Sequence, residues 1–338
     1  MSAQKSKKFS FLTTAYKTEA YLGDTIESVL AQTSPDWELV VVDNGMDDAI
    51  AAIVQSYASD ERIRLVRQEN KGYAGGVMAA AEAASGDFFV VLDSDDQVLP
   101  GFCRAVAALV DSDPGVDAVG CDAFRFDDDG LDLPIGYYRS TNIKKKPDPK
   151  HRLNLTDLVG GYVPYYTAAI RQSVWEEVGG YDRGDQELHE SVVIWLRMVD
   201  RYDIRVLPQR LARFRLRSDS LTRDPKAVEA FAEELERSFS YAAPSDEEAK
   251  AALESTLRTL RYWVLLRRAR FALLSGDDVG ARLAAREAFA QRRTVRAAMV
   301  LAAVNIAPGA LRVAHPAKQK ITTKLSHAVG RLVSAIKR

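Results

Sequence analysis

The sequence predicts an α/β fold with a mostly parallel sheet and a helical C-terminal region. Three observations support this prediction. Short apolar segments alternate with amphipathic segments through residues 9–92. Several apolar segments end in polar residues, as strands do where they leave a sheet. After Pro225 the pattern changes to long stretches with helical periodicity. Strands that alternate with helices favour a parallel sheet covered by helices on both faces.

The N-terminal elements follow in order. We expect strands at residues 9–13, 38–42, 63–67 and 88–92. We expect helices at residues 21–32, 48–57 and 75–84, the first with Leu22, Ile26 and Val29 on one face. Neither the P-loop pattern nor Gly-x-Gly-x-x-Gly follows any of these strands. P-loop nucleotidases and dinucleotide oxidoreductases are therefore disfavoured. Residues 126–153 are polar and predict an inserted loop, beside which the Tyr137-Tyr138 and Tyr165-Tyr166 pairs offer stacking surfaces for sugars.

The C-terminal third is predicted to be helical, at residues 226–242, 245–274, 277–292 and 294–305. From Ala288 to Arg338 there are ten Lys and Arg residues and no Asp or Glu. Residues 317–337 place an apolar stripe beside a basic one, which predicts either an interfacial helix on an anionic membrane or a terminal helix packed on the protein. We predict three parts: a catalytic domain at 1–224, a helical accessory domain at 225–308 and a basic amphipathic segment at 309–338.

Composition limits the alternatives. The chain has 338 residues, of which 47% are hydrophobic, so it has enough apolar material for a core. Its two cysteines and four histidines cannot form a disulfide framework or a four-ligand zinc site. The lysines at the N-terminus are not followed by the apolar stretch of a signal peptide. We expect a cytoplasmic protein without a nucleic-acid partner, held peripherally on the inner face of the membrane if the C-terminal segment binds lipid.

A cluster of acids follows the fourth predicted strand. Asp93, Asp95 and Asp96 lie within four positions, with Ser94 between the first two. Open α/β sheets bind their ligands at this end of the strands. Carboxylates so close together repel one another, and a hard divalent cation relieves the repulsion. The alternative is an Asp-rich turn that caps the next helix.

Five ordered segments resemble the inverting nucleotide-sugar glycosyltransferases of family 2, which have the GT-A fold. The segments are 11–17, 22–33, 38–45, 69–75 and 92–101, and a looser likeness continues through 171–182, 195–198 and 220–223. The resemblance therefore covers roughly residues 8–224. It implies a GT-A fold, a nucleotide-sugar donor and Mn²⁺ or Mg²⁺ as cofactor.

The resemblance also implies roles for single residues. Thr14 and Tyr16 would line the pocket for the base. Asn44 stands where the family commonly has an Asp that hydrogen-bonds the base, and its amide is compatible with uracil. Arg67 and Lys71 would lie near the pyrophosphate. For each of these contacts a purely structural role is an equal alternative.

The acid cluster matches the metal site of that family. The resemblance implies that Asp95 holds the metal and that Asp93 contacts the metal, the ribose or an arginine. Ser94 would lie in the donor site, and Asp96 would face the donor sugar. The family often has a second metal ligand, a His, where this chain has Arg217. Either the ion is held more weakly, or Arg217 supplies positive charge to the diphosphate directly.

A second departure concerns the catalytic base. Family members usually carry Glu-Asp before a Trp-Leu-Arg helix, and the Asp deprotonates the acceptor hydroxyl. Alignment on Trp195 places Glu190 at the first acid and Ser191 at the second. We predict that Glu190 is the base, with Glu187 and His189 as alternatives.

Two functions remain open at this point. One is an enzyme that transfers a sugar, most simply from a UDP-sugar, to a hydroxyl of a cell-surface glycan, wall polymer or lipid-linked acceptor. The other is an inactive or weakly active relative that binds a nucleotide sugar or a partner, which the residues Ser191 and Arg217 favour.

Overall fold

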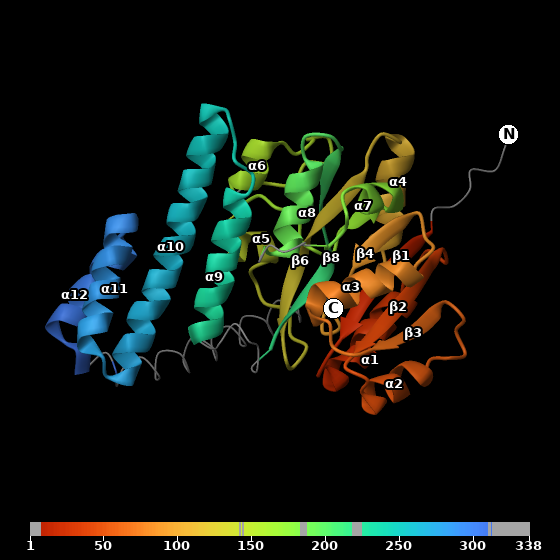
Figure 1. The fold of residues 1–338 in the computed structure, drawn as a ribbon, viewed down its shortest axis with the longest axis horizontal. Helices are drawn as coiled ribbons and strands as arrows, with labels where there is room; N and C mark the ends of the chain where they lie inside the picture. The colour runs from red at the N-terminus through yellow and green to blue at the C-terminus, as the bar shows by residue number, and fades with distance from the viewer. Residues whose placement is uncertain are drawn as a thin grey trace.

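The computed structural model describes residues 8–141, 143, 145–182, 188–217, 225–309 and 312. Its eight strands form one sheet in the order β3-β2-β1-β4-β7-β6-β8-β5 (Figure 1). They are β1 (Phe9–Ala15), β2 (Trp37–Asn44), β3 (Ile63–Gln68), β4 (Phe88–Val91), β5 (Gln97–Val98), β6 (Ala118–Asp127), β7 (Ala169–Arg171) and β8 (Ile204–Leu216).

The sheet is mostly parallel, as predicted. Parallel pairing joins β3 to β2, β2 to β1, β1 to β4 and β6 to β8. Strand β7 runs antiparallel between β4 and β6, which makes β6 parallel to β4. The carboxyl ends of β1, β2, β4, β6 and β8 therefore lie at the same edge of the sheet. Each of these strands delivers the residue that follows it to that edge.

Helices cover both faces of the sheet. One face packs on α1 (Glu19–Leu30), α2 (Asp48–Gln55) and α4 (Phe102–Ser112). The other packs on α3 (Gly72–Ala83), α6 (Leu155–Val159), α7 (Gln172–Glu177) and α8 (Glu190–Met198). The seven elements predicted within residues 9–92 are all present, with boundaries that agree within three residues.

The predicted loop at 126–153 is partly wrong. Strand β6 extends to Asp127, and α5 (Tyr137–Ser140) forms a helical turn inside the segment. Tyr138 is buried, and its backbone N–H donates to Asp122 while its hydroxyl accepts the N–H of Tyr165. Tyr138 and Tyr165 are therefore core residues and present no stacking surface. Both tyrosines were visible in the sequence, but the polar residues around α5 gave no sign that this segment is anchored in the core.

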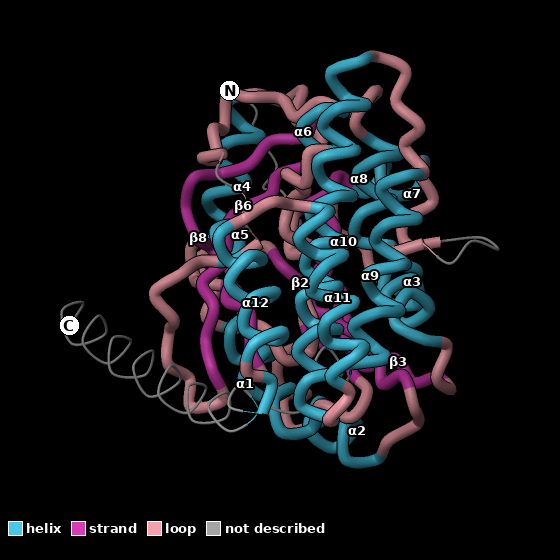
Figure 2. Tube along the Cα trace, turned by 90° about the vertical axis from the view of Figure 1, so that its left-hand side faces the viewer, coloured by secondary structure: helices cyan, strands magenta, loops and turns pink. Residues whose placement is uncertain are grey.

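Four long helices follow: α9 (Pro225–Ser240), α10 (Glu247–Ser275), α11 (Asp278–Gln291) and α12 (Val295–Ile306), which stand side by side at one end of the molecule (Figures 1 and 2). The predicted turn between α10 and α11 is present, with Gly276 at a φ of 88° and Asp277 capping α11. Phe239 of α9 and Ala249 of α10 are buried in the same cluster as α8, so the first two helices continue the core of the sheet. Helices α11 and α12 pack on the later part of α10 in separate clusters. The three-part domain division remains a prediction, and most of the segment 309–338 lies outside the described residues.

Candidate active site

The acid cluster lies at the carboxyl edge of the sheet, immediately after β4. Tyr16 follows β1 at this edge, Asn44 is the last residue of β2, and Arg217 follows β8. The topology thus brings residues from four distant segments of the sequence to one edge.

Asp96 is an anchor inside the site. Its side chain is buried and accepts hydrogen bonds from the hydroxyls of Tyr165, at 2.6 Å, and Tyr166. Its other oxygen accepts the backbone N–H of Arg215 at 2.7 Å. Burial raises the pKa of Asp96 well above its usual range, and the charges of Asp95 and Asp93 add to this. With both oxygens occupied, Asp96 holds the β4 end to β8, and its contact with the donor sugar remains a prediction.

Asp93 lies beside a tyrosine of α3. The Tyr73 hydroxyl donates to Asp93 at 2.5 Å. Burial, together with the charge of Asp95, raises the pKa of Asp93 to about 7. Asp93 and Asp95 are therefore two neighbouring, partly buried carboxyl groups that repel each other when both are ionised. A bound cation would relieve this repulsion.

Asp95 faces two arginines from the end of β8. Its carboxylate is 3.2 Å from the Arg217 guanidinium, and its carbonyl accepts a hydrogen bond from Arg215 Nε at 2.8 Å. Both guanidinium groups lie over the ring of Tyr21, at 4.9 Å for Arg215 and 4.7 Å for Arg217. Fixed positive charge is therefore in place beside the predicted metal ligand.

Within the described residues, no group of three or more His, Cys, Asp or Glu side chains forms a complete metal site. Asp93 and Asp95 nevertheless fit two ligands of a hard cation, since both offer oxygen and their charges repel each other. Donor phosphates and water would complete the shell of such an ion.

Thr14 and Tyr16 flank the neighbouring strand ends. The Thr14 hydroxyl is buried and has no hydrogen-bond partner in the described part of the chain. A Cβ atom at Gly76 would lie 2.3 Å from Thr14 Cγ2, so α3 can approach β1 only with glycine there. The Tyr16 side chain is 46% exposed, and a Cβ atom at Gly45 would lie 3.0 Å from its ring. An open aromatic face therefore lies over the end of β2.

Three other residues that were predicted to bind the nucleotide-sugar donor bond to the protein itself. The Asn44 side chain accepts from Gln68 Nε2 at 2.8 Å and from the N–H of Lys71 at 3.1 Å, and it donates to the Gly72 carbonyl at 2.9 Å. Asn44 thereby fixes the loop that leads into α3. Arg67 donates to Asp43 and to Asp48, each at 2.9 Å, and these bonds raise its pKa. The structure gives all three residues a structural role, and their contacts with a ligand stay predictions.

Glu190 is the first residue of α8 and is buried. Burial raises the pKa of Tyr181, and the charges of Glu190 and Asp93 raise it further, so both acids lie near this tyrosine. His189 and Ser191 bond to each other, with Ser191 Oγ 2.7 Å from His189 Nδ1. The His189 ring packs on Phe231 of α9. Glu187 lies outside the described residues.

Comparison with known proteins identifies the family. The model of glycosyl transferase family 2 matches residues 10–178, half of the chain. The chain belongs to this family. EpsH of Bacillus subtilis, named as a glycosyltransferase, is 34% identical over 123 residues, which are 36% of this chain and 35% of EpsH. TuaG of the same organism, named as a teichuronic acid biosynthesis glycosyltransferase, is 41% identical over 90 residues, 26% of this chain and 36% of TuaG. The alignments thus span about a third of the length of these two relatives.

Solved structures support the same fold. The mannosyltransferase PcManGT from Pyrobaculum calidifontis, solved in complex with GDP-Man and Mn²⁺, matches with a TM-score of 0.62 and 18% identity. The match covers 97% of this chain and 87% of that one. The predicted GT-A fold is confirmed.

Several residues of this family 2 site were not predicted from the sequence. Tyr73 and Tyr166 contact the acids, and Arg215 supports Asp95. The Tyr165-Tyr166 pair was visible in the sequence, but no local pattern places it against an acid 69 positions away. Tyr73 is the second residue of α3, and no sequence pattern marks it as a partner of the acids.

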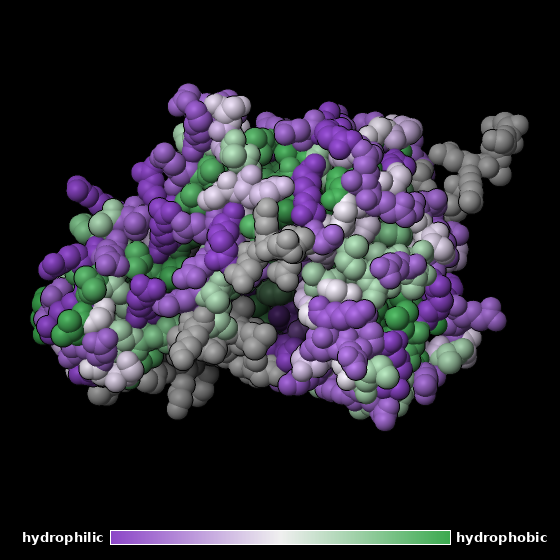
Figure 3. Space-filling model, viewed as in Figure 1, coloured by the Kyte–Doolittle hydropathy of each residue, from purple (hydrophilic) through white to green (hydrophobic). Residues whose placement is uncertain are grey.

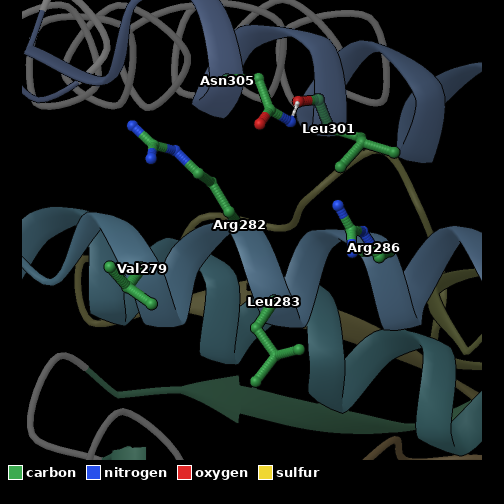
Figure 4. Close-up of a pocket in the computed structure, with 6 residues that line it drawn as sticks. All are labelled: Val279, Arg282, Leu283, Arg286, Leu301 and Asn305. Atoms are coloured by element: carbon green, nitrogen blue, oxygen red, sulfur yellow. Dashed lines mark hydrogen bonds between the residues drawn. The ribbon is translucent and has the colours of Figure 1, made fainter.

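A separate groove of about 210 Å³ lies on the C-terminal helices, away from the acids (Figure 4). Arg282 and Arg286 of α11 line it together with apolar side chains and Asn305 of α12. The surface around it exposes Val279, Leu283, Met299 and Ile306, and Figure 3 shows hydrophobic residues among hydrophilic ones at this end of the molecule. None of the described helices is long and apolar enough to cross a bilayer.

Proposed function

We propose that this family 2 member is a metal-dependent inverting glycosyltransferase. It transfers a sugar from a nucleoside-diphosphate sugar, most simply a UDP-sugar, to a hydroxyl of a cell-surface glycan, wall polymer or lipid-linked acceptor. The observation that supports this most is the presence of Asp93 and Glu190 around one tyrosine, Tyr181, beside the cationic end of β8. Residues that could bind the donor, stabilise the leaving group and activate the acceptor are then present in one site.

The donor half uses the strand ends. Tyr16 offers its exposed face to the base, and Thr14 supports the pocket from the end of β1, where its hydroxyl is buried. Asn44 holds the loop that carries Lys71, whose charge favours the pyrophosphate. Arg217 donates to phosphate oxygens as the bond to the sugar breaks, because a guanidinium stabilises the negative charge that develops there.

Asp95 and Asp93 are the residues that would hold Mn²⁺ or Mg²⁺. A bound ion supplies Lewis-acid stabilisation of the leaving diphosphate. Asp96 keeps the end of β4 in position through its bonds to Tyr165 and Arg215.

Glu190 takes the proton of the acceptor hydroxyl. The start of a helix suits this carboxylate, since its negative charge is favoured there. Glu190 is also the acid nearest the family's usual base position, which Ser191 occupies here, and the Ser191 hydroxyl bonds to His189.

The acceptor class rests on the relatives and on the C-terminal helices. TuaG is named for teichuronic acid biosynthesis, which supports a wall polymer. The α11–α12 face combines exposed apolar side chains with Arg282 and Arg286, a composition that suits an anionic membrane surface. A site held at the membrane would meet a lipid-linked or nascent acceptor.

Donor hydrolysis tests the proposal. The full chain is incubated with a panel of UDP- and GDP-sugars, with and without Mn²⁺, and released nucleoside diphosphate is measured. Turnover that requires the metal supports the enzyme. The Arg217–Asp95 ion pair favours the alternative of an inactive nucleotide-sugar binder, because it occupies a carboxylate that a metal needs. Donor binding without hydrolysis or transfer at any metal concentration would establish that alternative.

A further inference from the structure

Arg125 of β6 is a half-buried cation whose charge no carboxylate balances among the described residues. Its guanidinium appears in no hydrogen bond or ion pair there, and burial lowers its pKa. The arginines of the neighbouring strand β8 each pair with an aspartate: Arg205 with Asp203, Arg210 with Asp122, Arg213 with Asp132 and Arg215 with Asp24. An unpaired cation removed from water is unfavourable, so this one calls for a function.

The aromatic layer that links Arg125 to the acids shows where it lies. Arg125 is opposite Phe214 in the β6–β8 register, and paired residues lie on the same side of a sheet. The Phe214 ring is 5.6 Å from that of Tyr137, which is 4.6 Å from that of Tyr165. Tyr165 in turn bonds to Asp96. Burial raises the pKa of Tyr137 to about 12, the charges of Asp96 and Asp93 add to this, and Arg125 opposes it. Tyr137 therefore lies between the cation and the acids.

The side chains of Arg125 and Arg215 leave the paired strands β6 and β8 in opposite directions. Side chains alternate along a strand, so Phe214 and Arg215 of β8 face opposite ways. Arg215 and Arg217 both lie over Tyr21. Arg125, with Phe214, belongs to the Tyr137 side. A second anion-binding group, separate from the one predicted for the diphosphate, suits the acceptor rather than the donor.

We propose that Arg125 and the Tyr137 hydroxyl form a subsite for an oxyanion on the acceptor, next to the sugar or lipid that carries the reacting hydroxyl. This inference rests on the proposed transferase function. The planar fork of a guanidinium binds phosphate or carboxylate with two parallel hydrogen bonds. Burial and nearby charges act on the Tyr137 hydroxyl, with no hydrogen bond among them in the described residues, so it can donate a third. Two acceptor groups share this chemistry, a phosphate and the carboxylate of an acidic sugar, and a neutral acceptor would leave Arg125 unpaired.

Direct binding to the full chain, without donor or metal, tests the subsite. The probes are inorganic phosphate, glucuronate and, as the neutral comparison, glucose, and their binding is measured by calorimetry. Arg125→Gln removes the charge and keeps much of the shape. Arg139→Gln is the matched control, because Arg139 is an exposed residue of the same α5 turn as Tyr137.

We expect wild type to bind phosphate or glucuronate but not glucose. Arg125→Gln should weaken anion binding about tenfold or more, because a charge-assisted hydrogen-bond pair is lost. Tyr137→Phe should weaken it by a smaller factor, and Arg139→Gln should leave it unchanged. Tighter binding of phosphate identifies a phosphorylated acceptor, and tighter binding of glucuronate identifies an acidic sugar.

Three results would overturn the inference: no anion binding by wild type, equal binding by wild type and folded Arg125→Gln, or an equal loss in Arg139→Gln. If Arg125→Gln does not fold, Tyr137→Phe decides, because it removes only a hydroxyl. Because the probes are bound without donor, the result does not depend on turnover. A wild type that binds phosphate but never hydrolyses a donor would contradict the proposed function and leave the subsite standing.

Discussion

Asp95→Asn separates the metal role of the acid cluster from its cost in stability. The substitution removes the ion pair between Asp95 and Arg217. The Asp95 side chain is 23% exposed and the Arg217 side chain 19%. Such pairs contribute about 0–1 kcal/mol. The substitution also removes the charge that, after burial, raises the pKa of Asp93, and each pKa unit relieved is worth about 1.4 kcal/mol. These effects oppose each other, so the free energy of unfolding should stay within about 1 kcal/mol of wild type.

Ligand binding should respond very differently. A nucleotide sugar with Mn²⁺ at a hundred times its dissociation constant stabilises wild type by about 2.7 kcal/mol, which is several degrees in melting temperature. Asp95→Asn should lose the Mn²⁺-dependent part of this shift. The control is Asp129→Asn, which removes one exposed negative charge at the turn after β6. If Asp95→Asn keeps the full Mn²⁺-dependent shift and turnover, Asp95 is not the ligand and the assignment fails.

Three further outcomes are expected. Glu190→Gln should lower transfer by about 10²-fold or more with donor affinity unchanged, measured by single-turnover kinetics; transfer within a few-fold of wild type, or enhanced transfer in Ser191→Asp, would move the base to another residue. Folding raises the pKa of Asp93 from 3.8 to about 7, so its folded carboxyl holds a proton that the unfolded one releases. Wild type should therefore lose stability relative to Asp93→Asn as the pH rises from about 4 to 7, by at most about 4 kcal/mol in urea unfolding, and pH profiles that run parallel would contradict this. In flotation with anionic vesicles, the full chain should float more than a chain cut before Pro316, and equal flotation would exclude the C-terminal segment as the anchor.

Much of the fold was predictable because the first strands of the sheet are recognisable as apolar segments in the sequence. Strands β1, β2 and β4 are buried along their whole length, and β4 and the centre of β2 are continuous apolar runs. The long helices carry side-chain caps at Asp246, Asp277 and Thr294, which mark where they begin. Strands β5 to β8 were not predicted, and β7 was the hardest to see because it has three residues and lies just before α7. Its antiparallel pairing depends on partners from distant segments.

The site was predictable only where a single segment determines it. The position of the acids was predictable because they directly follow the apolar residues of β4, so the strand has to end there. Their partners come from α3, β8 and the loop before β7, and no local pattern fixes which tyrosine reaches which acid. Asn44 shows the converse problem. Its residue type suited a base contact equally well, while the structure shows its amide bonded to the loop before α3.

Three carboxylates within four residues have three different surroundings, and the backbone explains why. The chain turns after Asp93, since the N–H of Asp96 bonds back to the Asp93 carbonyl. Asp96 is thereby directed inward to Tyr165 and the β8 backbone, Asp93 towards Tyr73 on α3, and Asp95 towards Arg217 after β8. The buried member is satisfied by neutral donors, which hold it in place without supplying a positive charge. Asp93 and Asp95 are therefore the members predicted to bind a cation, which would replace the proton on Asp93 and the Arg217 contact of Asp95. Because Asp96 is satisfied, its replacement should act through folding, whereas replacement of Asp95 should act through the ligand.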